Sequence, residues 1–218
     1  MNDKKICFIV CANNQEYVDE QIAYLNALSV PDGYELEVLT IWEAASMTAG
    51  YNEGMNSTDA KYKVYMHQDV FIVNKNFVVD MLRVFSDETV GMLGVVGTPI
   101  LPENCVMWNW ADARVGRVYF NGNYQSGESI QNEIKGLYQE VEAVDGLLMA
   151  TQYDIPFRED LFDGWDFYDI SQCQEFRRSG YKVVVPKQEE AWCIHDDGCF
   201  NLKDYYTYRR RFVEEYKK

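Results

Sequence analysis

Residues 61–73 read KYKVYMHQDVFIV and are the most informative stretch of the sequence. An apolar run rich in strand-forming residues ends abruptly in His67-Gln68-Asp69. In open α/β sheets, ligands bind beyond the carboxyl ends of such strands. Residues two apart on an extended chain share a face, so we expect His67 and Asp69 to point the same way. A carboxylate there can hold Mg²⁺ or Mn²⁺ against a diphosphate, and a simple polar turn is the alternative.

The segments around this stretch alternate between strand and helix patterns. Strand patterns occur at residues 5–12, 34–41, 62–66 and 90–96. Helical patterns lie between them: after the candidate caps Asn13 and Asn14, over 45–57, and over 76–86 with Asn74 as the expected cap. This alternation predicts βαβ units and a mostly parallel sheet.

After residue 99 the pattern is less regular. It indicates edge strands at 113–120 and 137–144, a helix at 169–179, a strand at 181–185 and a helix from Leu202. We therefore expect an α/β fold in one domain over residues 1–218, with a central, mostly parallel mixed sheet flanked by helices. A nucleotide-binding half would end near residue 99, an acceptor half would span about 100–200, and a C-terminal helix would follow over about 201–218.

The composition limits the possible partners. The net charge of -15, from 35 acidic and 20 basic residues, argues against nucleic acid as a partner. One divalent cation with a few backbone N–H groups can still hold a diphosphate. The 6 cysteines form no CxxC pair and are expected to be reduced thiols. No apolar run approaches the roughly 18 residues of a membrane helix, so we expect a cytoplasmic protein.

Two later segments could also carry chemistry. Residues 162–180 read FDGWDFYDISQCQEFRRSG, in which Asp163, Asp166 and Asp169 are expected to open a helix. Acids are favoured in a first helical turn anyway, and the functional alternative is a general base. Residues 193–199, CIHDDGC, contain His195, which could be a neutral imidazole ligand. Zinc is a weaker interpretation of that segment, because no second ligand cluster accompanies it.

Several familiar motifs are missing from the sequence. It contains no GxxxxGK[ST], no GxGxxG and no GxSxG. These absences argue against a P-loop, an ordinary dinucleotide site and a serine hydrolase.

Four segments together resemble a known family. They are ICFIVCANNQEY (6–17), AGYNEGMNSTDAKYKVYMHQDVFI (49–72), FYDISQCQEFRRSGYKVVVP (167–186) and the late His195. Their order resembles the family-2-like glycosyltransferases of the GT-A fold, and in particular a small bacterial glycosyltransferase-like branch. The resemblance covers about residues 5–198. Two positions depart from the family pattern, with His67 at the first acid of Asp-x-Asp and Tyr168 at the Glu of Glu-Asp.

The resemblance implies roles for particular residues. Asp69 matches the last acid of Asp-x-Asp, and His195 matches a histidine that completes the metal shell around Mn²⁺ or Mg²⁺. Asp169, with Asp166 beside it, matches the candidate base for the acceptor hydroxyl. The nucleotide side would be formed by Ala12, Asn13, Glu43, Asn52, His67 and Gln68. The acceptor side would be formed by Trp108, Trp110, Asp145 and Trp165, although packing is the alternative role of the tryptophans.

The resemblance also implies a function. It predicts a metal-dependent, inverting glycosyltransferase with a nucleotide-diphosphate sugar donor, a UDP-sugar being favoured, and a glycan or lipid-linked acceptor. A catalytically degenerate nucleotide- or glycan-binding member of the fold is the alternative, motivated by His67 and Tyr168. A nucleotidyltransferase would need a Gly-rich basic first loop, which CANNQEY does not provide. The C-terminal helix would dock on the domain or make at most peripheral membrane contact.

Overall fold

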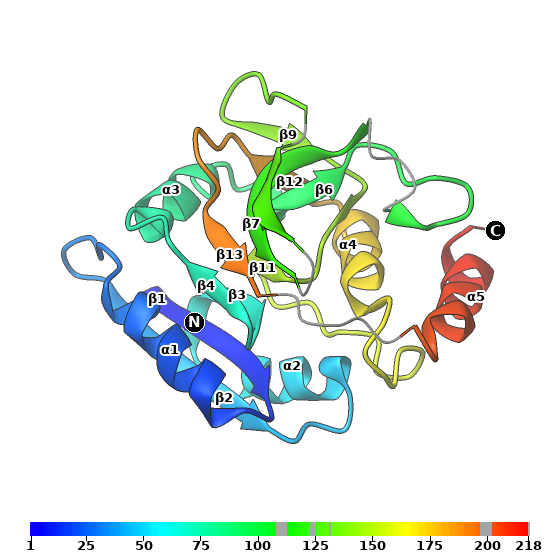
Figure 1. Ribbon diagram of the computed structural model, residues 1–218, viewed down its shortest axis with the longest axis horizontal. Helices are drawn as coiled ribbons and strands as arrows, with labels where there is room; N and C mark the ends of the chain where they lie inside the picture. The colour runs from blue at the N-terminus through cyan, green and yellow to red at the C-terminus, as the bar shows by residue number, and fades with distance from the viewer. Residues whose placement is uncertain (108–112, 123–124, 131, 197–201, 218) are drawn as a thin grey trace.

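The computed structural model describes residues 1–107, 113–122, 125–130, 132–196 and 202–217. A mixed sheet of seven strands forms its centre (Figure 1). In spatial order these strands are β2 (Glu35–Trp42), β1 (Asn2–Ala12), β3 (Ala60–His67), β11 (Leu148–Thr151), β5 (Val90–Gly94), β12 (Lys182–Pro186) and β9 (Tyr138–Glu140). Strands β2, β1, β3, β5 and β12 run one way, and β11 and β9 run the other. The expected mixed, mostly parallel sheet is confirmed.

A second sheet lies against one end of the first. Its order is β10 (Ala143–Val144), β6 (Val96–Thr98), β7 (Val115–Asn121), β13 (Cys193–His195) and β4 (Val70–Ile72), and β8 (Ser126–Ile130) pairs with β7. This sheet matters for function because β4 begins directly after Asp69 and β13 ends at His195. It was not predicted, since its strands are short and its partners lie far apart in the sequence.

Helices cover both faces of the central sheet. They are α1 (Gln15–Asn26), α2 (Met47–Asn56), α3 (Phe77–Val84), α4 (Tyr168–Arg178) and α5 (Tyr205–Tyr216). Alternate residues of β1 divide the core in two: Phe8 belongs to the cluster with α1 and α3, and Ile9 to the cluster with α2 and α4. This near-continuous apolar strand is buried on both faces, as its sequence predicts.

Helix α5 packs outside α4 (Figure 1). Phe212 of α5 is fully buried in a third cluster, with Leu101, Phe162 and Phe167. The expected docking of this helix on the rest of the molecule is therefore confirmed. No helix in the described parts of the chain is both long and apolar enough to cross a membrane.

Some sequence predictions were wrong in detail. The strand expected at 90–96 is two strands, because the chain passes from the central sheet to the second sheet at Val95. The strand expected at 137–144 divides in the same way into β9 and β10. The N-cap of α3 is Asn76 and not the expected Asn74. The Asn74 side chain accepts a hydrogen bond from the backbone N–H of Asn76 (3.0 Å). The caps Asn14 of α1 and Ser46 of α2 both accept backbone hydrogen bonds within the first turn.

Candidate functional site

The carboxyl ends of three parallel strands meet at one edge of the central sheet. The strand register pairs Ala12 with Trp42 and Cys11 with His67. The backbone N–H of Glu43, which follows β2 in a left-handed conformation (φ 51°), donates to the Ala12 carbonyl (3.1 Å). Ala12, Glu43 and His67 therefore lie along one edge, where open α/β sheets bind ligands.

A buried glutamine of α1 holds the turn between β3 and β4. Gln21 of α1 is 1% exposed, and its Nε2 donates to the carbonyls of His67 (2.8 Å) and Val70 (2.9 Å). Within the turn, the Gln68 carboxamide accepts from the backbone N–H groups of Asn13 and Asn14 (3.0 Å each). These bonds fix the direction in which Asp69 leaves the strand.

Strand β13 brings the second histidine to this turn. His195 pairs with Val70 in an antiparallel register, and the backbone N–H of Asp196 donates to the Asp69 carbonyl (2.9 Å). The Asp196 carboxylate then accepts from Tyr17 (3.1 Å) and Asn121 (2.6 Å). The end of β13 is thereby tied to both α1 and β7.

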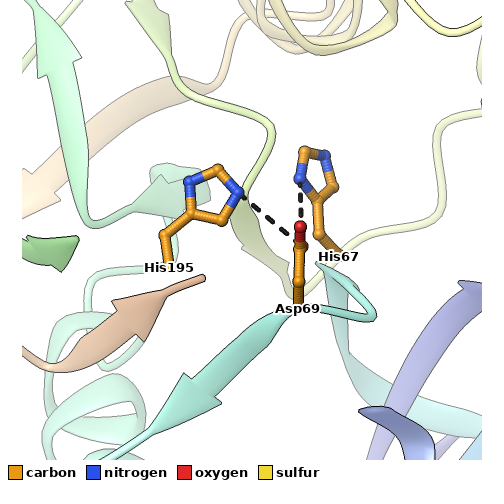
Figure 2. Close-up of side chains that lie close together, drawn as sticks. All are labelled: His67, Asp69 and His195. Atoms are coloured by element: carbon orange, nitrogen blue, oxygen red, sulfur yellow. Dashed lines mark ion pairs between the residues drawn. The ribbon is translucent and has the colours of Figure 1, made fainter. Parts of the chain in front are cut away.

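His67, Asp69 and His195 form a candidate metal centre. Figure 2 shows the three side chains pointing toward one another, from the end of β3, the start of β4 and the end of β13. Asp69 Oδ1 lies 4.0 Å from His67 Nδ1 and 3.6 Å from His195 Nε2. The candidate ligand atoms all lie within 4.8 Å of one another. Two ligands of one ion with bonds of about 2.1 Å lie no more than about 4.2 Å apart, so the donor set fits a divalent cation after small side-chain movements.

The histidine at position 67 is suited to metal binding by its charge state. Burial, with a smaller contribution from the neighbouring His195, lowers the pKa of His67 to about 3. The ring is therefore neutral at physiological pH and has one nitrogen lone pair free for an ion. The family resemblance places His67 on the nucleotide side, and the geometry adds it to the candidate metal ligands Asp69 and His195.

A tyrosine joins this cluster to the start of α4. Tyr168 is 4% exposed, and its hydroxyl forms a hydrogen bond with His67 Nε2. Burial raises the pKa of Tyr168 well above its usual range, so the phenol stays neutral. Gly146 leaves the space that this hydroxyl occupies, since a Cβ at residue 146 would lie 2.2 Å from Tyr168 Oη.

Asp169 follows Tyr168 in the first turn of α4. Its Oδ2 accepts a hydrogen bond from the backbone N–H of Gly146 (3.1 Å). Burial, with a smaller contribution from the nearby carboxylate of Asp145, raises the pKa of Asp169 to about 7. A carboxyl group with a pKa near 7 is matched to general base catalysis at neutral pH.

Helix α4 begins at Tyr168, one residue before the predicted start, but of the three acids expected to open it only Asp169 lies in the helix. Phe167, with φ 64°, stands in the left-handed region directly before α4, so Asp163 and Asp166 lie in the preceding loop rather than in the helix. Asp163 forms an ion pair with Arg211 (2.6 Å) on α5. Burial raises the pKa of Asp166, and the charge of Asp204 contributes to this.

The loop that carries these acids is held to α2 on both sides of Asp163. Thr48 of α2 donates to the Phe162 carbonyl (2.6 Å), and the backbone N–H of Met47 donates to Gly164 (2.9 Å). Trp165 lies on this loop and is 54% exposed. An exposed tryptophan on a held loop, next to candidate bases, is available to a ligand.

Of the remaining predicted residues, some have contacts that the structure describes and others lie outside the described parts of the chain. The Asn52 carboxamide bonds to both backbone groups of Phe157 (3.0 and 2.8 Å), so it links α2 to that segment. Asp145 Oδ1 accepts from the N–H of Leu147 (3.0 Å) and shapes the turn before β11. Trp108, Trp110 and Cys199 lie outside the described residues. Cys193 is a free, fully buried cysteine, and burial raises the pKa of its thiol.

Sequence reasoning missed the residues that support the cluster. Gln21, Gly146 and Asp196 act through contacts to distant segments, and Tyr168 was noted only as a departure from the family pattern. The Asp-Gly pair at 145–146 is a turn signal that could have drawn attention to this loop.

The central sheet, the strand-end site and the flanking helices define the GT-A fold of nucleotide-sugar glycosyltransferases. The solved mannosyltransferase PcManGT from Pyrobaculum calidifontis, in complex with GDP-Man and Mn²⁺, matches with a TM-score of 0.62 at 13% identity, over 100% of this chain and 65% of that one. S. aureus TarS 1-349 matches with a TM-score of 0.61 at 15% identity, over 96% of this chain and 65% of that one. These similarities concern the fold.

The sequence itself identifies the family. Residues 7–216 match the model of the family described as "Glycosyltransferase like family", and the chain belongs to it. The streptomycin biosynthesis protein StrF from Streptomyces griseus is 28% identical over 188 residues, which cover 82% of this chain and 64% of StrF. This chain thus spans slightly less than two thirds of the length of these relatives.

Proposed function

We propose that the protein is a metal-dependent, inverting glycosyltransferase. It would move a sugar from a nucleotide-diphosphate donor, with UDP-sugars favoured, to a hydroxyl group of a glycan or lipid-linked acceptor. The observation that carries the proposal is the arrangement of two chemical groups around Tyr168. The His67–Asp69–His195 cluster lies on one side of this residue, and Asp169, with its pKa of about 7, follows it on α4.

The donor side of the proposal rests on the edge formed by β1, β2 and β3. Ala12, Asn13 and Glu43 follow the strand ends beside His67 and Gln68. The structural relatives support a nucleotide ligand, since PcManGT was solved with GDP-Man and Mn²⁺, and TarS with UDP and with UDP-GlcNAc. We extend this ligand class to the present chain as part of the proposal.

His67, Asp69 and His195 would hold the divalent cation. A bound divalent cation stabilises the negative charge that grows on a departing diphosphate. The chain positions its own ligands for this task through Gln21, which holds the turn before Asp69, and through Asp196, whose backbone joins β13 to that turn.

Asp169 would act as the general base. The acceptor hydroxyl would give its proton to the Asp169 carboxylate while its oxygen forms a bond to the anomeric carbon. The bond between that carbon and the diphosphate oxygen breaks in the same displacement, with the electron pair leaving on the diphosphate. The proposal needs no enzyme nucleophile, and a single displacement inverts the anomeric configuration.

The acceptor side would include the loop before α4. Trp165 offers an exposed aromatic face, Asp166 lies next to it, and the turn at Asp145 contacts the start of α4 through Gly146. Sugars bind aromatic faces through apolar and C–H contacts, which suits a tryptophan held on a fixed loop. Trp108 and Trp110 remain predicted acceptor residues on sequence grounds.

The first experiment is a thermal-shift panel of UDP, GDP, CDP and their sugar conjugates, with and without Mn²⁺. Ligand at about 100 times its Kd adds about 2.7 kcal/mol to the free energy of unfolding, which a melting curve resolves. We expect a metal-dependent shift for a uridine nucleotide that Asp69→Ala abolishes. Asp32→Ala, in the exposed turn after α1, removes the same charge and should keep the shift. A shift that persists in Asp69→Ala would contradict the metal assignment.

A second experiment tests the chemistry. Proton NMR of the product made with the identified donor should show an anomeric configuration opposite to that of the donor. Asp169→Asn should abolish transfer while nucleotide binding stays intact. Loss of transfer in Asp166→Asn with full activity in Asp169→Asn would move the base assignment to Asp166.

A catalytically degenerate binding protein is the second candidate. Two observations favour it, namely His67 in place of the first acid of the metal motif and Tyr168 in place of the acid before Asp169. Such a protein would bind a nucleotide sugar or glycan without turnover. Metal-dependent transfer or hydrolysis of a nucleotide sugar by the wild type, lost in Asp69→Ala, would exclude it.

A further inference from the structure

The candidate metal centre differs from a carboxylate site in its donor atoms. Two of its three ligands are imidazole nitrogens, from His67 and His195, and one is the Asp69 carboxylate. Mg²⁺ prefers oxygen ligands and keeps several waters, whereas imidazole suits borderline transition metals such as Fe²⁺, Co²⁺ and Zn²⁺. The type of donor atom therefore influences which metal ion the site binds.

The orientation of His67 decides whether it can be a nitrogen ligand. Its Nδ1 faces Asp69 at 4.0 Å, and its Nε2 faces the hydroxyl of Tyr168. For Nδ1 to bind an ion, its lone pair must be free, so the ring proton must reside on Nε2. Tyr168 Oη is in position to accept that proton in a hydrogen bond, as the outer partner of a ligating histidine usually does.

Tyr168 is itself held in place by packing. Its ring is 4% exposed and meets the ring of Tyr51 edge-on at 5.8 Å. Its hydroxyl occupies the space that the missing side chain of Gly146 leaves. A tyrosine fixed in this way gives His67 little freedom to rotate, because rotation would break the bond at Nε2.

We propose that this centre selects a borderline transition-metal ion over Mg²⁺, with His67 as a ligand through Nδ1 and Tyr168 as the positioning residue that holds the His67 ring. The inference rests on the metal dependence in the proposed function and narrows the identity of the ion. It also gives the two departures from the family pattern a common explanation, since His67 and Tyr168 contact each other. His67 provides a nitrogen ligand where the family pattern has a carboxylate, and the Tyr168 hydroxyl orients the His67 ring.

Direct metal binding tests the selectivity without any measurement of transfer. Co²⁺ titrated into the metal-free protein should give a visible absorption band typical of nitrogen ligation, and Mg²⁺ in large excess should not displace it. His67→Asp keeps three ligands but replaces nitrogen by oxygen. We expect the ratio of Co²⁺ to Mg²⁺ affinity to fall by at least about tenfold in this variant. Equal competition by Mg²⁺ in the wild type, or an unchanged ratio in His67→Asp, would overturn the proposal.

A pair of tyrosine variants tests the positioning role. Tyr168→Phe removes only the hydroxyl that contacts His67, and loss of such an outer partner weakens metal binding by about 10–100-fold. Tyr51→Phe is the matched control, because the buried Tyr51 hydroxyl has no hydrogen-bond partner among the described residues. It should bind Co²⁺ like the wild type. If the two variants lose the same affinity, general packing rather than the His67 contact is responsible.

The same titrations separate this inference from the proposed function. They are run with the metal alone and repeated with UDP, and a melting curve of each variant confirms that it is folded. Strong binding of both Mg²⁺ and Co²⁺ would refute the selectivity and leave the transferase proposal standing. Binding of neither ion, with or without UDP, would refute the metal dependence itself.

Discussion

The backbone N–H of Gly146 donates a 3.1 Å hydrogen bond to Asp169, and the same glycine faces the hydroxyl of Tyr168. One residue in a turn thus contacts both the proposed base and the residue that orients His67. A Cβ at this position would lie 2.2 Å from Tyr168 Oη and 2.9 Å from the Asp169 Cβ, distances that real contacts do not reach. The start of α4 would have to move.

We therefore predict that Gly146→Ala lowers both stability and activity. Overpacking of a buried site destabilises proteins by about 1–3 kcal/mol, which urea unfolding measures. Transfer should fall by more than the folded fraction explains, because Asp169 and Tyr168 shift together. Gly127→Ala is the control, since a Cβ there would meet only ordinary contacts with Phe120 at 3.4 Å or more. Wild-type transfer by folded Gly146→Ala would contradict this view of the turn.

The pH dependence of transfer should report Asp169. A base must be deprotonated to accept a proton, so kcat/KM should rise with pH through about 7 and level off above it. Asp145→Asn removes the like charge that helps to raise this pKa, while its remaining oxygen can still accept from Leu147. The acid limb of the profile should move to lower pH in this variant. An unmoved limb would mean that the profile reports a different group.

The same pKa predicts a pH-dependent gain of stability in Asp169→Asn. The folded-state pKa of about 7 lies above the unfolded value of about 3.9, so the protonated carboxyl favours folding. Its contribution is fully present below about pH 4 and is lost as the pH rises through about 7. Asp169→Asn, which carries no charge, should be more stable than the wild type by about 1–3 kcal/mol at pH 8 and about equal to it at pH 4. Chemical denaturation at the two pH values measures this difference, and an equal effect at both would be inconsistent with the raised pKa.

A buried lysine lies on β3, on the face of the sheet that also carries Tyr65 and His67. Lys63 on β3 is fully buried, and its Nζ donates to Asp154 (2.7 Å) and to the Ala60 carbonyl (2.7 Å). Asp154→Asn leaves the charge of Lys63 without its counterion and should lower the free energy of unfolding by about 1–3 kcal/mol, less than for a fully buried pair because Asp154 is partly exposed. Asp59→Asn, which breaks a solvent-exposed contact to Lys5, should lower the free energy of unfolding much less. Urea unfolding of both variants makes the comparison.

Much of the fold was predictable because its signals are local. The strand ending at His67 and the helices around it follow from apolar periodicity and caps such as Asn14. The antiparallel strand β11 was missed, since four residues, LMAT, carry too little pattern to separate a strand from a loop. In the second sheet only β7, predicted at 113–120, is long enough to carry a pattern, and its other strands have two to five residues and, apart from β8, pair across large sequence separations.

Some residues of the candidate site could likewise be predicted from the sequence, and others could not. Asp69 and His195 were singled out because they lie at predicted strand ends and match metal-binding positions of the family that the sequence resembles, and the structure brings them within 3.6 Å of each other. The contact between His67 and Tyr168 joins residues 101 positions apart, and no local sequence pattern indicates it. Gln21 resembles any polar residue of an amphipathic helix until its bonds to the β3–β4 turn are seen.

Phe167 holds a left-handed backbone conformation directly before α4, and its ring packs against Tyr205 and Phe212 of α5. Such a conformation costs about 1–3 kcal/mol and persists only where surrounding contacts enforce it. The contacts come from a helix that is synthesised well after α4. On the ribosome, the donor edge can therefore form early, whereas the start of α4 reaches its final geometry only once α5 has emerged. The order of synthesis would leave the start of α4, and with it the position of the proposed base Asp169, unsettled until α5 can pack against Phe167.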